Sequence, residues 1–132
     1  MRFLPLGRGL SSLEPLLRER GAGALAVHGN WEFGRLVLDP SYRGGPEMLQ
    51  RCVFLAVSEL ARRFRCGQAV ASCTPVLSRL YRRFGFSVLA DDLRVPGEEK
   101  PYHLIQAQVS DVLLAAASTD AERSAARALL SA

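Results

Sequence analysis

The apolar residues of this chain are spaced in two ways, and each spacing predicts a different kind of element. Short apolar or alternating runs bounded by glycine, proline or asparagine predict strands, whereas apolar residues that recur every three or four positions predict helices. The predicted strands lie at residues 2–6, 24–28, 31–40, 68–72, 86–90 and 102–109. The predicted helices lie at residues 11–21, 46–65 and 74–84, and the alanine-rich residues 110–131 favour helix as well. This order predicts an α/β fold, with helices packed around one mixed sheet.

Glycines refine the expected strands near residue 30. Gly29 and Asn30 stand between two predicted strands, which is typical of a two-residue hairpin turn. Residues 24–28 and 31–40 are therefore expected to pair with each other. Gly34, inside the second of these strands, indicates a bulge or a close backbone approach.

Two of the predicted helices carry clear apolar stripes. The longer one has Pro46 in its first turn, and its stripe consists of Leu49, Cys52, Val53, Ala56, Val57, Leu60 and Phe64. The shorter one has Thr74 as its cap, Pro75 in its first turn and Gly85 as its stop. Its stripe consists of Leu77, Leu80, Tyr81 and Phe84, and Arg79, Arg82 and Arg83 cover the opposite, solvent-exposed side.

Length and composition indicate one globular domain over residues 1–132. We divide it into an N-terminal strand and helix (1–23), a core (24–109) and a C-terminal helix (110–132). Hydrophobic residues make up 48% of the chain and charged residues 23%, which is ordinary for a globular protein. No apolar run reaches the ~18 residues that a membrane span needs, and the N-terminus does not have the pattern of a signal peptide. We therefore expect a cytoplasmic protein.

Cysteine and histidine positions argue against metal and disulfide chemistry. Cys52, Cys66 and Cys73 are odd in number and form no Cys-x-x-Cys pair, so we expect no metal site and no disulfide. Cys52 is expected to be a buried thiol on the apolar face of its helix. His28 and His103 each stand alone in a strand-like segment and are interpreted as structural residues.

The net charge of +4 is unevenly distributed along the chain. Six arginines lie in one window without an intervening acidic residue: Arg62, Arg63, Arg65, Arg79, Arg82 and Arg83. Such a run indicates an acidic partner or a phosphate-bearing ligand, and the alternative is a solvated basic face. The combined aromatic and basic pattern that is typical of a nucleic-acid stacking platform is absent, so we disfavour nucleic acid as the partner.

Two segments in the right order resemble the GNAT (GCN5-related N-acetyltransferase) superfamily. "RLVLDPSYRGGPEML" is similar to the strand, R-x-x-G-x-G turn and helix that bind the acyl cofactor, although Pro46 and Met48 stand where the glycines of that motif fall. "TPVLSRLYRRFGF" is similar to the later helix that ends in Tyr and Gly-Phe. The resemblance covers about residues 24–109. It implies a mixed, mostly antiparallel sheet with helices on both faces and a V-shaped opening between two strands.

A second resemblance concerns the acyl donor. "WEFGRLVLDPSYR" is similar to the E-x-x-R-x-x-V segment of GNAT relatives that take acyl groups from acyl carrier protein, such as acyl-homoserine-lactone synthases and N-acyl amino acid synthases. The resemblance implies either acyl-coenzyme A or the acyl-phosphopantetheine of acyl carrier protein as donor, with no metal. An acidic carrier protein would dock on the arginines between Arg62 and Arg83.

The resemblance also implies roles for individual residues. Tyr81 would be the general acid for the leaving thiolate, and Glu32 the base, acting directly or through water. The cofactor-binding residues would be the backbone of Leu36, Val37 and Leu38, the turn formed by Arg43, Gly44 and Gly45, and Thr74 at a position where many relatives carry Asn. The alternatives are core packing for Tyr81 and a salt bridge with Arg35 for Glu32. Trp31 would line a pocket or belong to the core.

The expected function is that of an N-acyltransferase, which moves an acyl group from a thioester to the amine of a small molecule such as an amino acid. The main alternative is a non-catalytic GNAT-like binding module. A nucleic-acid-binding domain is the third reading, and it predicts steeply salt-dependent binding. An open strand edge near the last strand offers a contact for a homodimer.

Overall fold

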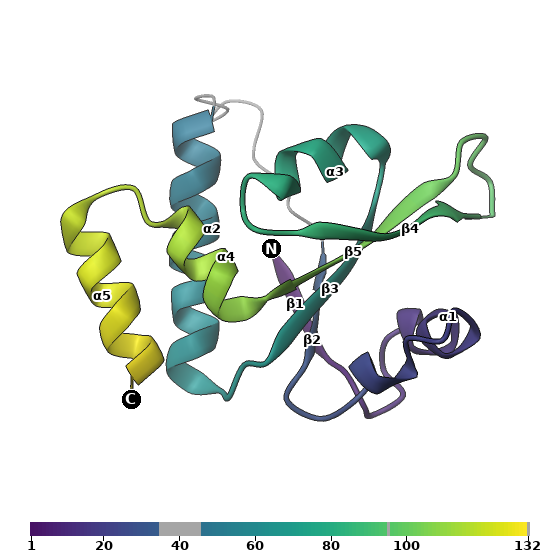
Figure 1. Cartoon of the computed structure of the whole chain (residues 1–132), viewed down its shortest axis with the longest axis horizontal. Coiled ribbons are helices and arrows are strands. Elements are labelled where there is room, and N and C mark those ends of the chain that lie inside the picture. The colour runs from purple at the N-terminus through teal and green to yellow at the C-terminus, as the bar shows by residue number, and fades with distance from the viewer. Residues whose placement is uncertain (35–45, 95, 132) are drawn as a thin grey trace.

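The computed structural model describes residues 1–34, 46–94 and 96–131, and these form one sheet with helices around it (Figure 1). The described strands are β1 (Arg2–Pro5), β2 (Trp31–Gly34), β3 (Gln68–Cys73), β4 (Ser87–Leu93) and β5 (Tyr102–Gln108). The described helices are α1 (Leu13–Glu19), the short 3-10 helix η1 (Gly23–Leu25), α2 (Pro46–Arg63), α3 (Pro75–Arg82), α4 (Val109–Ala116) and α5 (Asp120–Ser131).

The described strands lie in the order β1-β2-β3-β5-β4. The pairs β1–β2, β3–β5 and β4–β5 are antiparallel, and β2–β3 is parallel. The β3–β5 ladder is regular from Gln68–Gln108 to Cys73–His103, whereas the β4–β5 ladder has two register shifts. The expected mixed, mostly antiparallel sheet is confirmed.

Alternate residues of the strands feed two separate hydrophobic cores on the two faces of the sheet. On one face, Phe33, Ala71 and Ile105 pack with apolar side chains of α2, α3, α4 and α5. On the other face, Val70 and Leu104 pack with Leu6 and with the apolar side of α1. Figure 1 shows α1 well apart from α2, α4 and α5, and the expectation of helices on both faces is confirmed.

The hairpin expected around Gly29 and Asn30 is wrong. Residues 24–28 form no strand. Local hydrogen bonds of the 3-10 type form here instead, and one of them joins the Ala26 N–H to the Gly23 carbonyl at 3.0 Å. The antiparallel neighbour of β2 is β1, which precedes α1 in the sequence. β1 occupies the edge of β2 where the other strand of the hairpin was expected. Gly34 pairs in register with Arg2, so the described ladder has no bulge at this glycine.

The helix boundaries follow local signals closely. The Thr74 hydroxyl accepts a hydrogen bond from the Leu77 N–H at 3.3 Å, as expected for the N-terminal cap of α3. Gly85 adopts a φ of +85°, which residues other than glycine rarely adopt, as expected for the stop after the helix. In the C-terminal region, Thr119 and Glu122 form a reciprocal capping box for α5. The expected helix at 110–131 is two helices, since residues 117–119 separate α4 from α5.

Other boundaries differ from expectation. β4 continues through Leu93 into residues expected to form a loop. Phe64 lies beyond the end of α2 and is 54% exposed rather than part of the buried stripe. Cys52 is only half-buried. The last strand, β5, lies between β3 and β4, so the edges of the described sheet are β1 and β4, and the expected open edge near the last strand is that of β4.

Candidate functional site

The parallel strands β2 and β3 pair over a short distance and then separate. Their ladder holds two residue pairs, Trp31–Ala69 and Glu32–Val70. Phe33 and Gly34 still pair with β1, and β3 still pairs with β5 as far as Cys73, yet these parts of β2 and β3 do not pair with each other. Among the described strands, the β2-facing backbone groups beyond Val70 on β3 are therefore open at the C-terminal end. The V-shaped opening that the resemblance implies would lie at this point of the sheet.

Three side chains with proton-transfer capacity lie around the end of β3, on the face covered by α3. Cys73 belongs to the core on this face, and His103 is its direct partner across the β3–β5 ladder. Tyr81 projects from α3 into the same core, where its ring lies edge-on to Phe86 with the centroids 5.3 Å apart. The sequence had singled out Tyr81 alone among these three.

Burial controls the protonation of Tyr81 and Cys73. Loss of water around the phenol, with a smaller contribution from the charge on Cys73, raises the pKa of Tyr81 to about 12. Burial likewise raises the pKa of Cys73 to about 11. Tyr81 is therefore a neutral hydrogen-bond donor at neutral pH. Cys73 is a neutral thiol, which is poorly suited to act as a nucleophile.

His103 is the residue whose potential the sequence analysis missed. Its Nδ1 atom is buried and has no hydrogen-bond partner within the described part of the chain. A buried ring nitrogen without a partner is uncommon, and here it lies on the same face of the sheet as Tyr81. From the sequence, the alternation of Leu104 and Ile105 between the two faces could have assigned His103 to the face of Ile105. The alternation does not show which side chains lie next to His103 on that face.

Glu32 lies at the last β2–β3 residue pair but on the opposite face of the sheet from Tyr81. One carboxylate oxygen, Oε1, accepts a bond from the buried hydroxyl of Ser11, and the other, Oε2, lies 3.3 Å from a guanidinium nitrogen of Arg2. The ion-pair partner in the structure is thus Arg2 of the neighbouring strand, while Arg35 lies outside the described residues. The structure does not bring Glu32 and Tyr81 onto one face.

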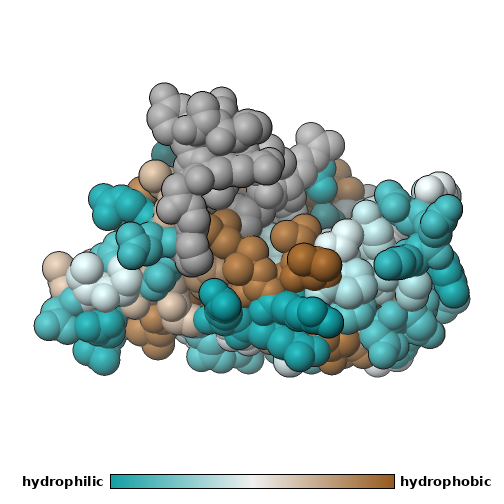
Figure 2. Space-filling model, turned by 90° about the horizontal axis from the view of Figure 1, so that it is seen from above, coloured by the Kyte–Doolittle hydropathy of each residue, from teal (hydrophilic) through white to brown (hydrophobic). Residues whose placement is uncertain are grey.

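The surface near this end of the sheet is partly apolar. Figure 2 shows hydrophobic residues gathered in the middle of the face seen from above, with hydrophilic residues around them. Val76 and Leu77 on α3 are 74% and 40% exposed, and Met48 in the first turn of α2 is 38% exposed. A contiguous patch of exposed apolar side chains is typical of a binding surface, whereas single exposed apolar residues are common on any protein.

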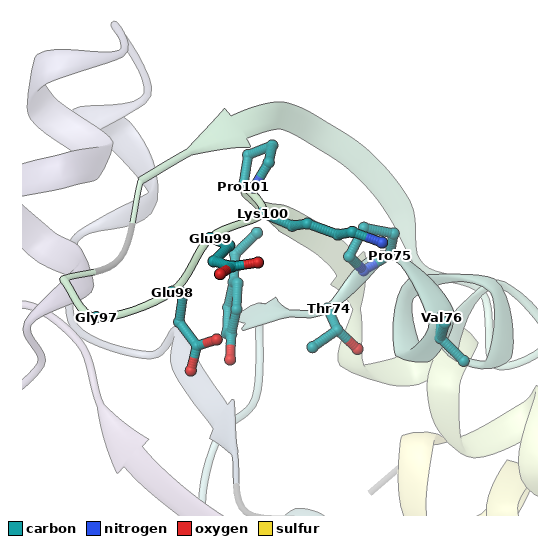
Figure 3. A pocket seen from close by; sticks show the side chains of 9 residues that line it. Thr74, Pro75, Val76, Gly97, Glu98, Glu99, Lys100 and Pro101 are labelled. Atoms are coloured by element: carbon teal, nitrogen blue, oxygen red, sulfur yellow. The ribbon is translucent and has the colours of Figure 1, made fainter.

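A cavity of about 460 Å³ opens beside Thr74, directly after the end of β3. One wall is the start of α3 with Thr74, Pro75 and Val76. The other consists of residues 97–101, between β4 and β5, and of Tyr102 at the start of β5. Figure 3 shows Glu98 and Glu99 across the cavity from Thr74, and the side chain of Lys100 extending toward Pro75. The cavity is large enough for a small ligand and carries both signs of charge.

Several predicted cofactor residues lie outside the described residues: Leu36, Val37, Leu38, Arg43, Gly44 and Gly45. The described chain resumes at Pro46, where α2 begins. Of the predicted cofactor-binding residues, Thr74 is thus the one that the structure places, and its hydroxyl caps α3.

The six arginines divide into two groups. Arg62, Arg63 and Arg65 precede β3, and the first two form ion pairs of 2.6 Å with Glu59, which lies just outside the sequence window. Arg79, Arg82 and Arg83 follow β3 on and after α3, are exposed, and have no acidic partner among the residues that the structure describes. The second group lies on the helix that begins at the opening.

The described residues contain neither a membrane-spanning helix nor a cluster of metal-ligating side chains. None of the described helices is long and apolar enough to cross a membrane. In the described ranges, no three His, Cys, Asp or Glu side chains converge in a way that could hold a metal ion.

Comparisons with known proteins inform the fold. No protein-family model matches the chain, and no curated protein matches it significantly. Among solved structures, the AHL synthase LasI is similar over 86% of this chain, with 19% identity and a TM-score of 0.59. A Lactobacillus plantarum protein assigned as an N-acetyltransferase is similar over 61%, with 20% identity and a TM-score of 0.52. The matched regions span 60% and 53% of those two chains. Together with the strand order, these likenesses show that the chain has a GNAT-like fold.

Proposed function

We propose that this protein is an N-acyltransferase, which transfers an acyl group from a thioester to the amine of a small molecule such as an amino acid. The observation that carries the proposal is the separation of β2 from β3 beyond Glu32 and Val70, with Tyr81 and His103 around the end of β3. An extended pantetheine chain in this opening would complete the backbone bonds that the two strands do not give each other. The acyltransferase fold of the structural neighbours supports the same reaction class.

The thioester carbonyl would be polarised by backbone N–H groups of the segment that continues β2. Direct attack by an amine places negative charge on that carbonyl oxygen, and fixed N–H groups stabilise it better than water does. We assign this role to the main chain near Leu36, Val37 and Leu38, as the resemblance implies. Arg43, Gly44 and Gly45 are the proposed phosphate contacts, since guanidinium and turn N–H groups bind phosphate well.

Tyr81 is proposed to stabilise the leaving thiolate by donating a hydrogen bond. A phenol with a pKa of about 12 is a weaker acid than a thiol, whose ordinary pKa is about 8.5, so complete transfer of its proton to the thiolate costs ~5 kcal/mol. A hydrogen bond to the thiolate carries no such cost. The proton that finally reaches the sulfur then comes from the attacking amine.

Two groups compete for the role of base toward that amine. Glu32 lies at the apex of the opening, but both of its oxygens have partners, Ser11 and Arg2. His103 lies on the Tyr81 face and has a buried nitrogen without a partner among the described residues. A comparison of Glu32→Gln with His103→Gln distinguishes them, because replacement of the true base should lower kcat of the enzyme about 100-fold or more.

The cavity beside Thr74 is proposed to hold the amine acceptor. Glu98 and Glu99 attract the ammonium form of an amine, and Lys100 attracts a carboxylate, which together fit the two charges of an amino acid. Glu98→Gln and Glu99→Gln should each raise the KM for the amine and leave the KM for the thioester unchanged. Glu19→Gln, on the exposed end of α1, is the matched control for loss of one carboxylate.

The donor is either acyl-coenzyme A or an acylated carrier protein. Arg79, Arg82 and Arg83 are exposed on and just after α3, the helix that begins at the opening, and suit an acidic carrier protein. Arg62 and Arg63 suit it less, since Glu59 already neutralises part of their charge. The three cysteines are free, as expected of a protein that works in a reducing compartment, and we propose the cytoplasm.

The first experiment is a calorimetric titration with acetyl- and long-chain acyl-coenzyme A, followed by acylated carrier protein. Micromolar binding of one donor, with thiol release when amino acids are added, supports the proposal. Thiol release should fall about 100-fold or more in Tyr81→Phe, while Ser58→Ala, which removes a buried hydroxyl of α2, should not affect it. Binding without thiol release from any donor and amine would instead identify a non-catalytic GNAT-like module.

A further inference from the structure

A second cavity, of about 290 Å³, lies at the opposite end of β2 and β3 from the opening. Its wall combines positive charge with aromatic surface, contributed by Arg8, Arg65, His28, Trp31 and Phe64. These residues come from three parts of the chain: the turn after β1, the turn before β2 together with the first residue of β2, and the link from α2 to β3. The cavity shares no residue with the one beside Thr74.

The positive charge at this cavity is not compensated within the described chain. Arg8 and Arg65 are both exposed, and neither lies within ion-pair distance of a carboxylate of the described residues. Arg62 and Arg63, a few residues away, each pair with Glu59. Two guanidinium groups that face one cavity repel each other, and an anion between them removes that repulsion and gains forked hydrogen bonds.

The aromatic wall explains why Phe64 departs from its predicted place. Phe64 is 54% exposed, and its ring packs against that of Trp31, with ring centroids 5.1 Å apart and an interplanar angle of 52°. An exposed phenyl ring beside an indole offers a flat apolar surface at the mouth of a basic cavity. Such a surface suits a planar group, since stacked or edge-on aromatic contacts add stability beyond simple burial.

Hydrogen bonds hold the aromatic side of the cavity in shape. The Trp31 indole N–H donates to the Arg65 carbonyl at 3.3 Å. The Gly67 N–H donates to the Gly29 carbonyl at 2.8 Å, which ties the link before β3 to the turn before β2. The backbone that carries Arg65 and Phe64 is therefore positioned without a ligand, which lowers the entropic cost of binding.

The Arg8 side of the cavity is held by a buried carboxylate. Glu14 accepts bonds from the N–H groups of Gly7 and Gly9, at 3.1 and 3.0 Å, and these two residues flank Arg8. Gly7 has a φ of +84°, and a Cβ there would lie 2.7 Å from the backbone nitrogen of His28. The turn thus packs tightly against the His28 segment and presents Arg8 from a fixed backbone.

We propose that this cavity binds a small anion with a flat apolar part. Arg8 and Arg65 hold its carboxylate or phosphate group, and Phe64 and Trp31 contact the flat part. The volume limits the ligand to about one ring with its charged substituent. The site is separate from the thioester opening and does not depend on the proposed acyl transfer.

Trp31 is the single tryptophan of the chain and therefore reports on this cavity directly by fluorescence. The probes are phenylacetate and phenyl phosphate, and the controls are phenethylamine, acetate and inorganic phosphate. A saturable change in Trp31 emission with one or both aromatic anions, at least about tenfold tighter than with the controls, supports the proposal, and the tighter of the two identifies the acidic group. No saturable change with either aromatic anion up to about 10 mM overturns it.

Charge variants test the proposed contacts. Arg8→Gln and Arg65→Gln should each weaken binding of the better probe about tenfold or more, because each removes a charged hydrogen-bond donor. The control is Arg127→Gln, on the exposed side of α5, which should bind the probe like the parent protein. Circular dichroism of each variant checks that it remains folded. Equal affinities in all three variants would overturn the assignment of Arg8 and Arg65.

Discussion

Replacement of Tyr81 by Phe tests the environment of the phenol directly through alkaline stability. Burial raises the pKa of Tyr81 from 10.0 to about 12 in the folded protein. Between these two values the unfolded chain loses the phenolic proton while the folded protein keeps it, so this group makes the folded state less stable as pH rises. At pH 11 the loss amounts to about 1.4 kcal/mol relative to neutral pH. Tyr81→Phe cannot ionise and should not show this loss.

The assay is urea unfolding of both proteins at pH 8 and pH 11 in the presence of a reductant. The parent protein should lose about 1.4 kcal/mol more than Tyr81→Phe between these pH values. Ser78→Ala, which removes a buried hydroxyl three residues earlier on α3, is the control and should behave like the parent protein. The same pH dependence in the parent and in Tyr81→Phe would refute the burial argument, because a phenol that is not desolvated has the same pKa in the folded and unfolded chain.

Three further substitutions test the packing around the site by urea unfolding. Leu113→Ala, at a fully buried position of α4, should lower the free energy of unfolding by roughly 2–5 kcal/mol. The neighbouring Leu114→Ala, at a 37% exposed position, should lower it much less, and similar losses in the two variants would contradict the assigned core. Thr74→Ala should cost about 1 kcal/mol by removing the cap of α3, and a Thr74→Ser variant should retain most of the stability. Glu32→Leu should cost about 1–3 kcal/mol because it leaves the buried Ser11 hydroxyl without its acceptor, and no loss would show that this contact contributes nothing.

The two cavities lie at opposite ends of the same parallel strand pair, and their chemistry differs. The cavity beside Thr74 combines carboxylates with one lysine, which suits a zwitterionic acceptor. The cavity beside Trp31 is basic and aromatic, which suits a flat anion. Because Trp31 and Glu32 are consecutive on β2, a ligand at the second cavity contacts the strand next to the point where the opening begins.

Local signals in the sequence were sufficient for the helices and most strands. Thr74 and Gly85 bound α3 as predicted, and the apolar spacing placed α2 within two residues of its observed end at Arg63. These features depend on hydrogen bonds and side chains within a few residues of one another, and such contacts are present in any fold that the segment joins. The motifs around Tyr81 and Arg43 were enough to predict the GNAT fold for the same reason, since each is a short local pattern.

Strand partners and strand faces were decided by the tertiary structure alone. The run at 24–28 is as apolar as a strand, but β1 occupies the edge of β2 that a hairpin would have used. A shift of one residue in a strand moves every side chain to the other face of the sheet. No local pattern could therefore show that Glu32 and Tyr81 lie on opposite faces, or that His103 is paired with Cys73 across the β3–β5 ladder. The exposure of Phe64 likewise depends on Trp31, which is distant in sequence. The sequence by itself determined most of the helices and strands and a GNAT-like order of elements, and long-range pairing determined which strands are neighbours and which side chains meet.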